Sequence, residues 1–160
     1  MDIDRRSVLV IAPAVGLVAM LDLSRAQNLS DFDPVAIARL RAGEIVREIA
    51  ASARDPSVAE PSRDDLFTTA LLLQAGLRAL LPVQARQGIA LPGTPSPRDP
   101  KELIAAQENY KAVFESGTLA TPAQTATAMD ALELAAQQLR KARYTLLAGK
   151  LTDWMRTQRP

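Results

Sequence analysis

Outside the N-terminal region, the most apolar stretch of the chain is residues 62–82, which read SRDDLFTTALLLQAGLRALLP. Apolar side chains recur along it at the spacing of a helix. Ser62 with Asp65 resembles a capping box in which Asp replaces Glu, so a helix is expected to begin there. Pro82 should end or kink this helix, and Gly88 is the natural stop. We expect this helix to lie deepest in the fold.

Two further helices are predicted by an Asp-Pro pair, in which the aspartate caps the helix by accepting backbone N–H groups and the proline occupies the first helical position. The first starts at Asp33-Pro34, carries an apolar stripe to Ala53, and runs for about twenty residues until Asp55-Pro56 disfavours its continuation. The other starts at Asp99-Pro100 and ends at Gly117.

A fourth helix is predicted from Thr121, with Gln124 placed to complete a capping box. Its apolar stripe consists of Ala128, Leu132, Ala135, Leu139, Ala142 and Leu146. It should end near Gly149 or run on to Met155. Four amphipathic helices with start signals predict an all-α fold, an antiparallel four-helix bundle.

The longest connection between these helices is residues 89–98, which contain three prolines and Gly93. Such a composition predicts a stiff, extended linker rather than a packed element. The linker is expected to cross between two helical hairpins. The alternative is a proline-rich strip that docks on another protein.

The composition excludes several classes of site. Apolar residues make up 48% of the chain and aromatic residues 4%, so the core must consist mainly of small aliphatic side chains. The chain has no cysteine and no histidine. It therefore lacks the ligands of iron–sulfur clusters and usual zinc sites, and the histidine of a Ser-His-Asp triad, and we expect no cofactor. A net charge of +1 does not indicate nucleic acid as a partner.

The first 26 residues have the organisation of an export signal. Arg5 and Arg6 precede fifteen uncharged residues, 7–21. That length suits the apolar core of a secretory signal and falls short of the roughly 20 residues that span a bilayer. Ser24 and Ala26 are small residues at the −3 and −1 positions of a cut after residue 26.

The arginine pair followed by Ser7, Val8 and Leu9 resembles the twin-arginine export signal, with Asp4 where a small polar residue is usual. We therefore expect residues 1–26 to be a signal peptide and residues 27–160 to form one helical domain in the periplasm. The alternatives are an uncleaved membrane anchor and an ordinary buried helix.

Pairs of carboxylates occur one helical turn apart, as at Glu44 and Glu48 and again at Asp130 and Glu133. Paired carboxylates can hold a metal or act as acid and base. Glu44 and Glu48 flank the apolar stripe rather than lie on it, and arginines are close by. We interpret both pairs as solvated helix faces with weak ion pairs.

The C-terminal segment combines charge with large apolar groups. After Glu133 it holds six basic residues and one acidic residue, Asp153. The helix dipole favours basic residues near a helix C-terminus, which is the simpler interpretation. The alternative is a face for an anionic partner protein or membrane surface. The predicted partner-binding residues are Arg140, Arg143, Lys150, Trp154, Met155 and Arg156.

A second resemblance bears on the partner. Leu23-Ser24, Leu29, Asp33-Pro34 and Ala38-Arg39-Leu40 resemble the opening of the small accessory subunits of membrane-bound flavin dehydrogenases for sugars and sugar alcohols. The resemblance implies an exported, non-catalytic accessory subunit of a periplasmic oxidoreductase. The alternative is a periplasmic carrier that holds a small apolar ligand between its helices, where Tyr110 and Tyr144 could line a pocket.

Overall fold

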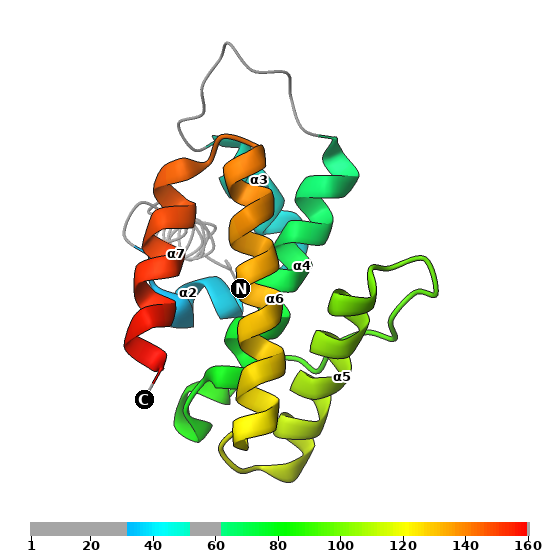
Figure 1. Cartoon of the computed structure of the whole chain (residues 1–160). Coiled ribbons are helices and arrows are strands. Elements are labelled where there is room, and N and C mark those ends of the chain that lie inside the picture. The colour runs from blue at the N-terminus through cyan, green and yellow to red at the C-terminus, as the bar shows by residue number, and fades with distance from the viewer. Residues whose placement is uncertain (1–31, 52–61, 160) are drawn as a thin grey trace, which may run out of the picture.

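The computed structural model describes residues 32–51 and 62–159, and in this part of the chain every regular element is helical (Figure 1). The elements are α2 (Pro34–Arg39), α3 (Ala42–Ala51), α4 (Arg63–Leu80), the 3-10 helix η1 (Val83–Arg86), α5 (Lys101–Ser116), α6 (Pro122–Lys141) and α7 (Thr145–Gln158). The predicted all-α class is therefore confirmed for the described residues. The predicted export signal, residues 1–26, lies outside them.

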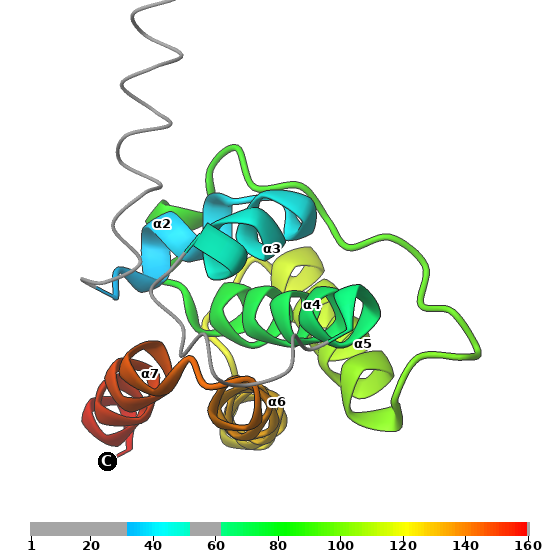
Figure 2. The ribbon, with the colours of Figure 1, turned by 90° about the horizontal axis from the view of Figure 1, so that it is seen from above.

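Helix α4 lies at the centre of the fold, and α2, α3, α5 and α6 all pack against it (Figure 2). It begins at the predicted cap, where the hydroxyl of Ser62 accepts a hydrogen bond from the N–H of Asp65 at 3.0 Å. Leu72, Leu73 and Leu77 have no exposed surface. The stretch that is most apolar in sequence is thus the helix around which the others assemble.

The first predicted helix is two helices, and the prediction of a continuous one is wrong. Asp33 caps α2 as expected, since its carboxylate accepts the N–H of Val35 at 2.9 Å. At Leu40 the backbone becomes extended, with ψ at 147°. The carboxylate of Glu44 then accepts the N–H of Arg41 at 2.8 Å, just before α3. Both helices turn their apolar sides towards α4, so the stripe continues across the break.

The connection from α4 to α5 carries the chain back along the fold. Leu81 is extended before Pro82, η1 follows, and Gly88 has a φ of +75°. Residues 89–98 contain no helix or strand. Figure 1 shows that they lead away from the end of α4 to the N-terminal end of α5. Helices α4 and α5 therefore run in roughly the same direction, and α6 runs opposite to both.

The start of α5 differs from its prediction. The carboxylate of Asp99 accepts the N–H of Ser96 at 2.8 Å in the turn before the helix. Pro100 occupies the cap position and makes no side-chain hydrogen bond. The aspartate therefore closes the linker rather than capping the helix. The predicted end is confirmed, because Gly117 stops α5 with a φ of +64°.

The fourth predicted helix is also divided. The capping box of Thr121 and Gln124 is present as expected. The chain then leaves α6 through Arg143, which has a φ of +66°, and resumes as α7. Gly149 lies inside α7 and ends nothing. With two predicted helices each divided, and with α4 and α5 running the same way, the antiparallel four-helix bundle is not confirmed.

Candidate interaction surface

The predicted functional residues fall into two groups. The export residues Arg5, Arg6, Ser24 and Ala26 lie outside the described part of the chain. The predicted partner-binding residues lie on α6, on α7 and in the turn between them. The structure places their side chains in three different environments: the core, a polar network on the outer face of α7, and an exposed corner.

Most of the large apolar residues of the C-terminal segment face inwards. Helix α7 packs against α6 and buries Leu147, Leu151 and Met155, the last with 6% of its surface exposed. Trp154 is half-buried, and its ring lies 5.7 Å from that of Phe32, just before α2. Met155 is thus a core residue, and Trp154 holds α7 against the chain that leads into α2.

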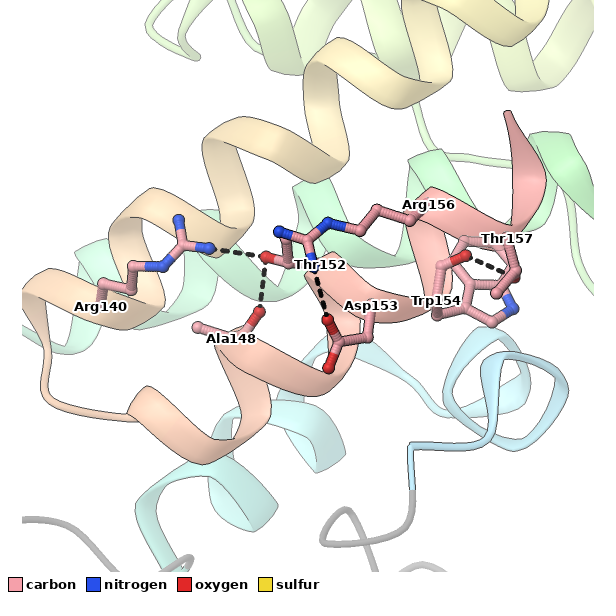
Figure 3. A network of polar contacts seen from close by, with 7 residues as sticks. All are labelled: Arg140, Ala148, Thr152, Asp153, Trp154, Arg156 and Thr157. Carbon is pink, nitrogen blue, oxygen red and sulfur yellow. Dashed lines mark hydrogen bonds and ion pairs between the residues drawn. The ribbon is translucent and has the colours of Figure 1, made fainter. Parts of the chain in front are cut away.

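A polar network covers the outer face of α7 (Figure 3). The guanidinium of Arg140 donates to the hydroxyl of Thr152 at 2.6 Å, and that hydroxyl donates to the carbonyl of Ala148 at 2.8 Å. Arg156 pairs with Asp153 at 3.2 Å. These contacts fix Arg140 across the two helices and neutralise Arg156 within α7.

The excess positive charge is left where α6 gives way to α7. Arg140, Lys141 and Arg143 are exposed, and none of them pairs with a carboxylate of the described residues. Leu146, in the first turn of α7, is 65% exposed. We call Arg140, Lys141, Arg143 and Leu146 the basic corner. Lys150 lies half-buried one turn further along α7.

The candidate carboxylates are dispersed. Glu44 is used in the α2–α3 break, and the carboxylate of Glu133 lies 4.0 Å from the guanidinium of Arg159. Burial raises the pKa of Glu48, and the nearby Arg47 partly opposes that rise. Within residues 32–51 and 62–159, no group of three or more His, Cys, Asp or Glu residues could hold a metal ion. No helix in this part is long and apolar enough to cross a membrane.

Tyr110 belongs to a partly buried polar cluster that the periodicity of the sequence does not indicate. Its hydroxyl donates to the carbonyl of Ala90 and lies 3.4 Å from the guanidinium of Arg78. Arg78 also donates to the carbonyl of Ala38 at 2.7 Å and to that of Leu40 at 3.3 Å. These contacts explain the α2–α3 break, because Arg78 satisfies the carbonyls at which α2 ends.

Arg86 plays a similar part at the C-terminal end of α5. Its side chain is buried and donates to the carbonyls of Leu81 at 3.1 Å, Val113 at 3.2 Å and Thr118 at 2.7 Å. Its guanidinium carbon lies 5.0 Å from the ring centroid of Phe114, and burial lowers its pKa.

In the sequence, these arginine contacts are indicated only by the isolation of Arg78, which is the single charged residue between residues 66 and 81.

The second tyrosine is also buried. Tyr144 exposes 2% of its surface at the start of α7, and its hydroxyl has no hydrogen-bond partner in the described part of the chain. Both tyrosines are therefore core residues, whereas the sequence left open that they line a pocket.

Comparison of the chain with protein-family models, with curated proteins and with solved structures finds no match.

Proposed function

We propose that the chain is an exported, non-catalytic accessory subunit that binds a partner protein in the periplasm, as the small subunit of an oxidoreductase complex. The observation that supports a binding role is the basic corner. It offers three exposed cations that no described carboxylate neutralises, beside a leucine that is 65% exposed. Charge and apolar surface therefore coincide at one end of the molecule.

Such a surface gains from association in two ways. Carboxylates on a partner would be attracted to the unneutralised cations and would fix the orientation of the encounter. Covering the side chain of Leu146 would add about 1–2 kcal/mol of hydrophobic stabilisation. Arginine is also among the residue types that most often anchor protein interfaces. The corner thus combines a steering charge with an apolar anchor.

The periplasmic location and the redox partner are supported by the sequence. Arg5 and Arg6 with the apolar residues after them resemble a twin-arginine signal, and Ser24 and Ala26 suit its cleavage. This route exports folded proteins, often with their cofactor. The short resemblance from Leu23 to Leu40 favours a flavin dehydrogenase as the companion. A chain without cysteine or histidine suits a non-catalytic partner in such a complex.

Co-purification tests the proposal. The chain, tagged at its C-terminus, is recovered from periplasmic and membrane extracts of the native cell, with a variant carrying Arg140→Gln and Lys141→Gln beside it. We expect a stoichiometric complex with an oxidoreductase that the variant retains poorly. Arg98→Gln with Lys101→Gln is the matched control, because both side chains are exposed and the loss of charge is the same.

Recovery of the chain alone from every extract would contradict the proposal. The alternative function, a carrier, makes a different prediction for the same sample. A carrier would release a small apolar molecule into organic solvent, in an amount that matches the protein and does not depend on Arg140 or Lys141.

A further inference from the structure

The backbone at Arg143 has a conformation that side chains other than glycine rarely adopt. Its φ is +66°, and the two other positive-φ positions of the described residues are Gly88 and Gly117. The N–H of Tyr144 donates to the carbonyl of Leu139 at 2.9 Å, and that of Arg143 to Arg140 at 3.0 Å. This is the Schellman pattern, whose left-handed position normally carries glycine.

The side chain of Arg143 offers nothing to the fold that would offset this strain. It is exposed and makes no hydrogen bond or ion pair within the described residues. The dipole of α6 favours cations near its end, but Arg140 and Lys141 already occupy its last turn. Glycine at position 143 would therefore make the domain more stable. A strained residue that does not stabilise the fold indicates a functional role at that position.

The neighbours of Arg143 indicate what its guanidinium would meet. Arg140 is held in place by Thr152, so one cation of the corner is already oriented (Figure 3). A guanidinium binds a carboxylate through two parallel hydrogen bonds, which suits the side chains of Asp and Glu. Leu146 supplies a small apolar contact beside these charges. Carboxylates grouped around a shallow apolar hollow would complement the corner.

A membrane surface fits the corner less well. Adhesion to anionic lipid usually needs clusters of about four to eight basic residues, or a broad apolar helix face as a second signal. The corner has three cations and a single exposed leucine, and the buried side of α7 faces α6. The charge and the apolar area are those of a small protein contact.

We infer that the basic corner is the docking site for an acidic face of the partner protein, and that Arg143 is kept in a left-handed conformation for this contact at the expense of stability. This inference rests on the proposed function and specifies the chemistry of its interface. It makes a paired prediction that a purely structural role would not make: one substitution should raise stability and weaken binding.

The test compares Arg143→Gly with Arg143→Lys in the purified full-length chain. Arg143→Gly should raise the Tm by about 2–5 °C, since glycine relieves the strain, whereas Arg143→Lys should leave it unchanged. The binding probe is a glutamate-rich peptide with interspersed leucines, titrated at low salt into isotope-labelled protein and followed by NMR. The peptide should shift the amide signals of residues 140–146.

The dissociation constant for this peptide should increase about tenfold in Arg143→Gly, which corresponds to ~1.4 kcal/mol. It should increase less in Arg143→Lys, which keeps the charge but loses the paired hydrogen bonds of the guanidinium. Arg98→Gly loses the same charge in the linker and should bind like the wild type. Equal binding by Arg143→Gly and the wild type, or a lower Tm for Arg143→Gly, would overturn the inference.

Vesicles containing phosphatidylglycerol are the second probe. They should leave the signals of residues 140–146 unchanged, and a shift of these signals by vesicles but not by the peptide would replace the protein partner with a membrane. Co-purification separates this inference from the proposed function. If the wild type and Arg143→Gly recover the same complex equally well, only the inference fails. If the wild type recovers no complex, the proposed function fails.

Discussion

Gly76 allows α4 and α6 to approach each other closely. A Cβ atom at this position would lie 2.6 Å from Cγ of Leu132 and 3.0 Å from the carbonyl oxygen of Ala128. The first contact is with a fully buried side chain and the second with backbone, so neither can move freely. The central helix pair of the fold therefore depends on one missing methyl group.

We predict that Gly76→Ala destabilises the protein by about 1–3 kcal/mol, because overpacking a close helix contact forces its neighbours to move. Gly149→Ala is the matched control. Gly149 also lies inside a helix, but nothing lies within 4 Å of its added Cβ. That substitution should stabilise the protein by about 0.5–1 kcal/mol, since alanine favours the helix. Urea denaturation measures both, and equal effects of the two substitutions would refute the prediction.

Tyr110 should make stability depend on pH in the alkaline range. Burial raises the pKa of its phenol, and Arg78 partly opposes that rise. The unfolded chain therefore loses this proton near pH 10, before the folded chain does. The stability that this pKa difference contributes is present below pH 10 and is lost as the pH rises further, towards the pKa of the folded state. At neutral pH, Tyr110→Phe should cost about 1 kcal/mol, because the carbonyl of Ala90 loses its donor.

The difference in unfolding free energy between the wild type and Tyr110→Phe should therefore shrink as pH rises from about 9 to 11. Urea denaturation across this range measures it, and the comparison cancels the titration of lysines common to both proteins. A difference that stays constant up to pH 11 would show that the phenol titrates alike in the folded and unfolded chains.

At the scale of the elements, the half-buried Arg78 and the buried Arg86 satisfy carbonyls at the ends of other helices. Arg78 of α4 satisfies carbonyls at the end of α2, and Arg86 of η1 satisfies carbonyls at the end of α5. Each cation also lies near the negative end of the helix whose carbonyls it binds. Segments distant in sequence are thereby joined by contacts that involve no carboxylate.

We predict that Arg78→Met destabilises the protein by about 2–3 kcal/mol, because it leaves half-buried carbonyls without their charged donor. The amides of α2 should lose protection against hydrogen exchange before those of α4 do. Arg63→Met is the control, since Arg63 is exposed in the same helix. Unchanged exchange in α2 would mean that packing on α4, rather than Arg78, holds that helix.

At the scale of the whole molecule, the export prediction concerns residues outside the described ranges. We expect the protein from native cells to begin at Gln27 and to be recovered from the periplasm, because the small residues Ser24 and Ala26 fit the export peptidase. N-terminal sequencing tests this, and an intact Met1 in a soluble cytoplasmic fraction would contradict it. Changing Arg5 and Arg6 to lysine should block export only through the twin-arginine route.

The sequence by itself determined the features that depend on near neighbours. The caps at Asp33, Ser62 and Thr121 and the stop at Gly117 could be predicted, because each needs contacts or backbone freedom within a few residues. The all-α class followed from the helical spacing of the apolar residues, which is also a local property of the sequence. The basic character of the C-terminal segment was also evident, and so was the exclusion of thiolate and imidazole chemistry.

Only the tertiary structure decided where the helices break and which charges stay unpaired. The break at Leu40 depends on Arg78, which lies in another helix, and the apolar stripe runs through it unchanged. Charge counting could not separate Arg156, which is paired, from Arg143, which is not. Phe67 belongs to the apolar stripe of α4, yet it is 43% exposed. Periodicity encodes which side of a helix is apolar, whereas burial and pairing depend on what the rest of the chain brings to that side.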